Sequence, residues 1–132
     1  MKSSYTVYPV NDVGVLATPV AASQNGTTGA VSATLATAAN KLTYISGFEV
    51  TFSNPTAATT ITVTVTNTVG GPLNYAQQVL AACAAVPPPP PLIVKFMPPI
   101  PASALNTAIA VNVPALGAGA PGVSVAAHGF QA

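Results

Sequence analysis

The stretch TITVTVTN (60–67) alternates apolar and hydroxyl side chains without a break. Ile61, Val63 and Val65 occupy every second position, and threonines occupy the positions between them. Side chains two residues apart share one face of a β-strand, and β-branched residues favour strands. The stretch therefore predicts a strand with one face in a hydrophobic core and the other face near water or a polar interface.

Other segments show the same two-residue period. In KLTYISGFEVTF (41–52) we expect the core face to carry Leu42, Tyr44, Phe48, Val50 and Phe52, and the polar face to carry Lys41, Thr43, Glu49 and Thr51. The further strands expected are 30–37, 73–80, 92–97, 108–114 and 123–131. Within two of these strands, the residues expected to face the core are Leu92, Val94, Phe96, Ile109, Val111 and Val113.

Turn-forming residues separate the strands, as in SNPTAAT (53–59) and LGAGAPG (116–122). Short strands that recur about every 10–15 residues, with no helix-length segment between them, are typical of antiparallel sandwiches. We therefore predict an all-β fold, an antiparallel β-sandwich of jelly-roll type, over residues 30–132. Residues 1–29 lack sustained alternation, and we expect them to form an extended N-terminal arm held by a neighbouring chain.

The stretch VPPPPPLIVKFMPPIPAS (86–103) allows two interpretations. Proline-rich ligands for aromatic grooves contain such prolines, but they normally lie in solvated segments. Here the prolines lead directly into LIVKFM, whose alternate residues require a core. Because proline cannot donate a hydrogen bond to a β-ladder, the flanking prolines should end the pairing. We interpret the stretch as a rigid loop, a buried strand and a rigid turn, and the loop as a candidate contact with a neighbouring subunit.

Charged residues make up 4% of the 132 residues, and arginine is absent. The charges are Lys2, Lys41, Lys95, Asp12 and Glu49. We expect Glu49 to form an ion pair with Lys41 or Lys95. A free monomer with so few charges would have little repulsion to keep it in solution, so we expect other protein to cover much of its surface.

Three dispersed lysines argue against nucleic acid as a partner. A membrane is also unexpected, because no apolar run reaches the roughly 20 residues of a membrane span.

The sequence offers few residues for catalysis or for metal binding. Cys83 and His128 are the only cysteine and the only histidine, and Asp12 and Glu49 are the only acids. A Cys83–His128 dyad or an Asp12–Glu49 pair could be written, but no catalytic motif surrounds them. LGAGAPG lacks the Lys-Ser/Thr of a phosphate-binding loop. We expect a buried thiol, a strand-end imidazole, and neither enzymatic activity nor a cofactor or metal.

Three stretches together resemble small structural proteins of tailed-bacteriophage virions. They are KLTYISGFEVT (41–51), TITVTVTN followed by GG-x-L-x-Y (60–75), and PLIVKFMPPIPAS followed by NTAIAVNVPALGAG and VSVAAHGFQ (91–131). The resemblance covers about residues 30–132 and lies in scaffold motifs. It implies a jelly roll on the outer capsid surface of a virion assembled in the host cytoplasm. The implied protein is either a decoration (cement) protein, which binds the major capsid protein, stabilises the capsid and commonly forms a homotrimer, or part of a head fibre.

The arm and the proline loop supply candidate assembly contacts. These are Tyr5, Val7, Tyr8, Val10, Val13, Val15, Leu16, Pro88, Pro89 and Pro90. Ordering an arm costs about 1–2 kcal/mol per residue for the backbone alone, so contacts with neighbouring subunits must offset that cost.

Two alternatives stay open at the level of the sequence. The first is a head-fibre or receptor-binding module, although the chain has no tryptophan and its tyrosines are scattered. The second is a secreted or cell-surface β-domain. Against it, the N-terminal segment is a poor signal peptide, because Asn11 and Asp12 interrupt the position of the apolar region.

Overall fold

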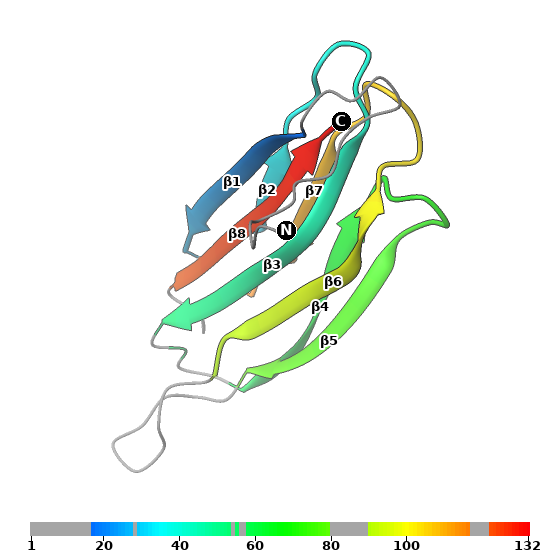
Figure 1. Cartoon of the computed structure of the whole chain (residues 1–132). Coiled ribbons are helices and arrows are strands. Elements are labelled where there is room, and N and C mark those ends of the chain that lie inside the picture. The colour runs from blue at the N-terminus through cyan, green and yellow to red at the C-terminus, as the bar shows by residue number, and fades with distance from the viewer. Residues whose placement is uncertain (1–16, 28, 54, 56–57, 80–89, 117–121) are drawn as a thin grey trace, which may run out of the picture.

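The computed structural model describes residues 17–27, 29–53, 55, 58–79, 90–116 and 122–132. They form two four-stranded antiparallel sheets that pack face to face (Figure 1). The strands are β1 (Thr18–Gly26), β2 (Val31–Leu35), β3 (Thr43–Ser53), β4 (Thr59–Thr66), β5 (Leu73–Val79), β6 (Leu92–Pro101), β7 (Ile109–Val113) and β8 (Gly122–Gln131). The predicted all-β antiparallel sandwich is confirmed.

The first sheet has the order β1-β8-β3-β6 and the second the order β2-β7-β4-β5. Four of the antiparallel pairs are nested: β1 pairs with β8, β2 with β7, β3 with β6 and β4 with β5. The first strand therefore lies beside the last, the second beside the second-last, and so on inward. This is the pairing of one long hairpin that has been folded over onto itself.

The core lies between the sheets and follows the predicted alternation over most strands. Ile61, Val63 and Val65 are at most 5% exposed, while the threonines between them face outward. The other core predictions that are confirmed as buried, or as packed against the buried cluster, are Leu42, Phe48, Val50, Phe52, Leu92, Val94, Phe96, Ile109, Val111 and Val113. The hydrophobic period alone thus located most of the core.

The register of β3 changes in the middle of the strand. Ile45 pairs with Gly129 of β8, and Gly47 pairs with the preceding residue of β8, His128. Ser46 is therefore an extra residue in β3, which is the definition of a β-bulge. Because successive side chains alternate between the two faces, one extra residue exchanges the faces on its N-terminal side.

This bulge corrects the faces predicted for residues 41–52. Thr43, expected on the polar face, is completely buried in the core. Tyr44, expected in the core, lies on the outer face of the first sheet, where its ring stacks on Phe130 with the centroids 4.7 Å apart. Beyond the bulge the prediction is right, and Phe48 is fully buried.

β1 lies within the residues expected to form the arm. Thr18–Gly26 pairs with β8 along its whole length, from Thr18 opposite Gln131 to Gly26 opposite Val123. Its sequence, TPVAASQNG, shows no apolar alternation because most side chains of this edge strand are exposed. The remaining part of the predicted arm, residues 1–16, is outside the described residues.

β6 is longer than predicted and includes prolines that were expected to form a turn. The strand continues through Pro98 and Pro99 to Pro101, and the Met97–Pro98 peptide is cis. Proline is tolerated there because β6 lies at a sheet edge, where an N–H on the open side has no strand partner. The described residues include no helix long and apolar enough to cross a bilayer.

Candidate functional site

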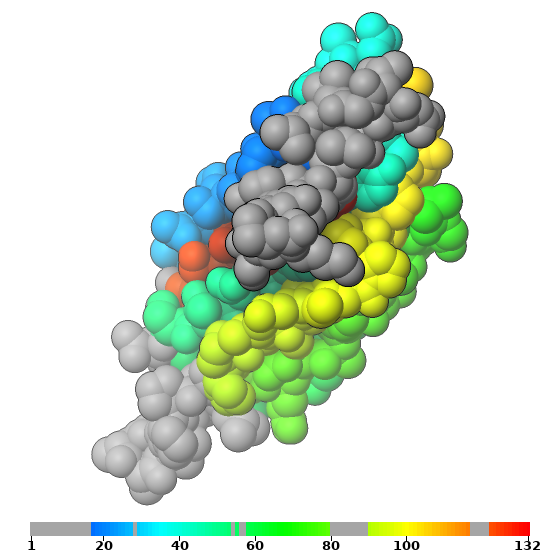
Figure 2. All heavy atoms as spheres, viewed as in Figure 1, coloured from blue at the N-terminus to red at the C-terminus, as the bar shows by residue number. Residues whose placement is uncertain are grey.

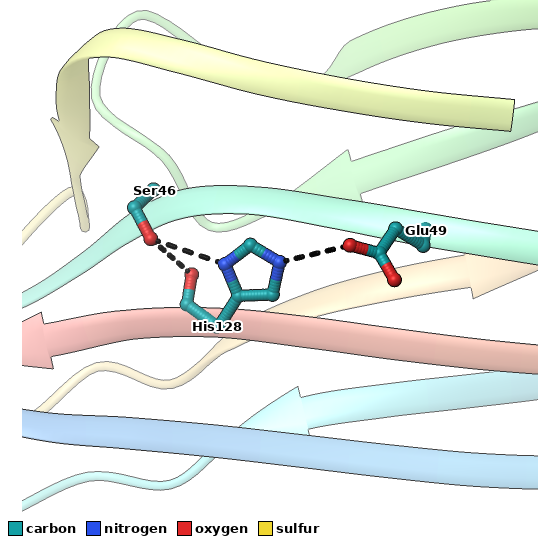
Figure 3. Close-up of polar contacts among 3 residues, drawn as sticks. All are labelled: Ser46, Glu49 and His128. Atoms are coloured by element: carbon teal, nitrogen blue, oxygen red, sulfur yellow. Dashed lines mark hydrogen bonds and ion pairs between the residues drawn. The ribbon is translucent and has the colours of Figure 1, made fainter.

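The polar side chains best suited to catalysis or metal binding lie together on the outer face of the first sheet (Figure 3). His128 of β8 lies between Ser46 and Glu49 of β3. Ser46 Oγ donates a hydrogen bond to the main-chain oxygen of His128 at 2.9 Å and lies 3.3 Å from its Nδ1. On the other side of the ring, Nε2 is 3.5 Å from Glu49 Oε1.

The bulge in β3 assembles this cluster. It turns Ser46 toward His128, and Gly47 leaves space for the imidazole ring. A Cβ atom at Gly47 would lie 3.1 Å from His128 Cε1 and 2.7 Å from the main-chain oxygen of Val94. Glu49 is two residues beyond Gly47 and therefore shares its face of the strand. A strand with regular alternation would not bring these side chains together.

The contact between His128 and Glu49 is solvent-exposed. Their side chains are 43% and 48% exposed, and the contact is an ion pair only when the imidazole is protonated. Exposed ion pairs contribute at most about 1 kcal/mol to stability. The expected pairing of Glu49 with a lysine is wrong for the described residues, since Lys41 Nζ instead donates to Thr18 Oγ1 at 3.2 Å.

Serine, histidine and a carboxylate are also the residue types of a hydrolase triad. In a triad the serine hydroxyl donates its hydrogen to the imidazole nitrogen that accepts the proton during catalysis. Here the hydroxyl of Ser46 donates to the main-chain oxygen of His128, so its lone pairs face Nδ1. A ring with hydrogens on both nitrogens satisfies Ser46 and Glu49 together. The geometry therefore favours a structural link between β3 and β8 over an activated nucleophile. We call this link, made by Ser46, His128 and Glu49, the polar clamp.

His128 and Glu49 could offer two ligands to a metal ion. A structural zinc site takes four protein ligands and a catalytic zinc site takes three. In the part of the chain that the structure describes, no three His, Cys, Asp or Glu side chains come together. The Cys83–His128 and Asp12–Glu49 pairs each include one residue outside that part.

A row of ring side chains crosses the same face beside the polar cluster. Pro19, Phe130, Tyr44 and Pro101 stand at facing positions on the four strands of the first sheet. The alternation of 41–52 predicts Tyr44 on the core face and therefore gives no sign of this row. The Ser-Gly pair at 46–47, inside an otherwise regular strand, was the signal for a bulge.

The outer face of the second sheet is uncharged. Its side chains are serine, threonine, asparagine, glutamine and alanine, and several pair with one another. Ser32 Oγ donates to Asn112 Oδ1 at 2.6 Å, Asn112 Nδ2 to Thr66 Oγ1 at 3.2 Å, and Thr64 Oγ1 to Asn74 Oδ1 at 2.9 Å. We call this surface the threonine face. It offers hydrogen bonds but neither a nucleophile with a base nor a titratable group.

A cavity of about 360 Å³ opens at one end of the first sheet between β1, β3 and β8. Its polar lining includes Asn25, Thr51, Ser53 and Ser124, and Ser124 Oγ already donates to Asn25 Oδ1 at 2.6 Å. All of the lining side chains are uncharged. Among the residues that the structure describes, the lining therefore supplies none of the acids, bases and metal ligands that catalysis needs.

The structure describes only one of the predicted assembly contacts. Pro90 is exposed and lies just before β6. The other candidates are outside the described residues: Tyr5, Val7, Tyr8, Val10, Val13, Val15, Leu16, Pro88 and Pro89. Comparisons of this chain with protein families, with curated proteins and with solved structures found no match.

Proposed function

We propose that the sandwich is a jelly roll. The nested pairing of β1 with β8, β2 with β7, β3 with β6 and β4 with β5 supports this assignment. A jelly roll consists of eight antiparallel strands in two sheets, built from two Greek keys, and it occurs in viral capsid and lectin domains.

We further propose that the protein is a structural virion protein that binds the outer surface of a tailed-phage capsid as a decoration (cement) protein. The resemblance of residues 30–132 to virion proteins suggests the class. The observation that carries the proposal is the scarcity of charge on the exterior: the described charges are Lys41, Glu49 and Lys95, and none lies on the threonine face. Burying an uncharged face whose polar groups already pair avoids the cost of desolvating ions.

In this proposal the protein acts by mass action and needs no catalysis. A ligand that binds the assembled shell more tightly than its dissociated subunits stabilises the assembled state. Homotrimers on the shell would contact the major capsid protein, and the N-terminal arms would reach neighbouring subunits. Neither nucleic acid nor a membrane takes part.

The test uses empty shells assembled from the major capsid protein of the virus that encodes the chain. Shells with and without saturating protein are sedimented, the bound copies are counted per capsid subunit, and shell disruption is followed during heating. The proposal expects stoichiometric binding over the lattice and disruption at a higher temperature. Binding of a few copies per shell, or no change in the disruption temperature, would contradict it. Light scattering of the free protein tests the trimer.

A receptor-binding module is the second candidate, and the position of Tyr44 favours it. Tyr44 and Phe130 form a stacked, partly exposed pair on an outer face, beside His128. Aromatic rings next to polar groups are the usual components of a glycan-binding surface. A glycan array with the intact protein and with Tyr44→Ser tests this candidate, which requires binding that the substitution abolishes.

A further inference from the structure

The sheet edges of this protein are not protected equally. The edge strands are β1 and β6 in the first sheet and β2 and β5 in the second. Exposed edges present unpaired N–H and C=O groups, and proteins block them with prolines, lysines, bulges or short strands. β6 contains Lys95, Pro98, Pro99 and Pro101 as well as a bulge opposite β3. β1 contains Pro19, and β2 is only five residues long.

β5 has none of these devices. Its sequence, LNYAQQV (73–79), contains neither a charge nor a proline, and it pairs with β4 in unbroken register from Leu73 to Val79. Among the described residues, β4 is its only neighbour in the sheet. β5 follows one margin of the molecule, where Figure 1 shows its ribbon and Figure 2 its atoms in green. The edge is thus uninterrupted, uncharged and seven residues long.

We propose that β5 pairs antiparallel with β5 of a second copy of this chain, centred on Ala76, so that the second sheets of two copies become one continuous sheet. Such a two-fold contact joins only two protomers, so it is separate from the three-fold contact of the proposed trimer and would link one trimer to another. In that register Ala76 faces its own equivalent, and residues equally distant from it face each other. Leu73 then lies opposite Val79, and Asn74 lies opposite Gln78. The remaining pair is Tyr75 opposite Gln77, which lies on the core side with the Leu73–Val79 pair, while Asn74 and Gln78 meet on the outer side.

This self-complementarity is what a two-fold contact requires. In an isologous interface the same surface serves both partners, so any charge near the axis would face a like charge. β5 has no charge, and cross-strand pairs of matched chemistry each add to the stability of the sheet. The two-fold register keeps residues of the same face opposite each other and brings no like charges together. The second copy is therefore the occupant that the edge fits best.

Disulfide trapping tests the register. Ala76→Cys is made together with Cys83→Ala, so that the new thiol is the only one in the chain. Directly opposed residues of antiparallel strands have Cα atoms about 4.5–5.5 Å apart, within the range that a disulfide spans. The matched control is Thr62→Cys with Cys83→Ala, because Thr62 pairs with Ala76 on the same exposed face of β4. In the proposed pair the two copies of residue 62 are about 14 Å apart, three strand spacings. We expect a covalent dimer from the first variant and none from the control.

Charge reversal tests the same contact without cross-linking. Ala76→Lys places two ammonium groups opposite each other and should weaken self-association about tenfold in sedimentation equilibrium. Ala76→Glu should do the same, and an equimolar mixture of the two variants should recover association as mixed dimers. Thr62→Lys adds the same charge one strand further in, and we expect it to change association far less.

Three results would overturn the inference. These are a wild-type protein that stays monomeric at high concentration, equal cross-linking at positions 62 and 76, and self-association that Ala76→Lys leaves unchanged. Circular dichroism of each variant checks its folding, and recovery in the mixture shows that both charged variants are folded. These measurements use the protein without capsid shells. A negative result would refute the β5 pairing alone, and the proposed capsid binding would still be tested by the shell experiment.

Discussion

At position 43 the chain buries a hydroxyl group in an otherwise apolar core. Thr43 is completely buried, and Thr43 Oγ1 has no hydrogen-bond partner among the described residues. Gln131, also buried and opposite Thr43, differs because its Nε2 donates to the main-chain oxygen of Ala36 at 2.6 Å. An unpaired buried hydroxyl costs about 1–3 kcal/mol, and an apolar group of the same shape avoids that cost.

Thr43→Val should therefore stabilise the protein. We expect the free energy of unfolding to rise by about 1 kcal/mol, because valine retains the shape and removes the unpaired oxygen. Urea unfolding of both proteins measures the change. Thr34→Val, on the exposed threonine face, serves as the control for β-propensity alone. A loss of stability for Thr43→Val would show that the hydroxyl has a partner.

Gly129 sets the closest approach between β3 and β8. A Cβ atom there would overlap the main-chain oxygen of Tyr44, which cannot move without breaking the ladder. Gly129→Ala should therefore reduce the free energy of unfolding by at least about 2 kcal/mol. Gly29→Ala is the matched control, since no atom of the described residues lies within 4 Å of the added group, and it should change stability by less than about 0.5 kcal/mol. Equal effects of the two substitutions in thermal unfolding would refute this account.

At the scale of the elements, the sandwich is joined at its β5–β6 side by a cluster of aromatic rings. Tyr75 of β5 meets Phe48 of β3 edge-on with the ring centroids 5.5 Å apart, and it lies 6.3 Å from Phe96 of β6. Such pairs contribute about 0.5–1.5 kcal/mol beyond their buried area. Burial of Tyr75 in this cluster raises the pKa of its phenol by desolvation.

The raised pKa gives stability a dependence on alkaline pH. The phenol loses its proton more readily in the unfolded chain, so above the ordinary tyrosine pKa of 10.0 the unfolded state binds fewer protons than the folded state. Stability should be unaffected by this group below that pH and should fall as the pH rises above it. Tyr75→Phe removes the phenol but retains the ring, so its urea midpoint should fall less between pH 9 and about pH 11 than that of the wild type. An identical fall in both proteins would assign the alkaline loss to other groups.

At the scale of the whole molecule, the proposed arm can be separated from the sandwich. β1 begins at Thr18, so deletion of residues 2–16 leaves all eight strands. We expect the truncated protein to fold with a similar circular dichroism spectrum but to bind capsid shells at least about tenfold more weakly, because in the proposed function the arm supplies contacts with neighbouring subunits. Sedimentation with shells measures the loss. Undiminished binding would show that the arm is not the anchor.

Much of the fold could be predicted from the sequence, but little of the candidate site. The strict alternation around Val63 located β4, and similar patterns located the core positions of β6 and β7. The polar clamp depends on the extra residue Ser46, which the apolar alternation of 41–52 does not locate, although the Ser-Gly pair at 46–47 signals a bulge. The sequence does not predict β1, because most side chains of this edge strand face water and show no two-residue apolar period.

The sequence by itself determined the class of fold, because a two-residue apolar period, frequent turn residues and the lack of helix-length segments allow little other than antiparallel sheets. It also determined that the exterior carries few charges. Only the tertiary structure decided the partners of each strand, the faces of Thr43 and Tyr44, and the meeting of His128 with Ser46 and Glu49. The physical reason is that alternation is local, whereas register and bulges are fixed by strands that are distant in the chain.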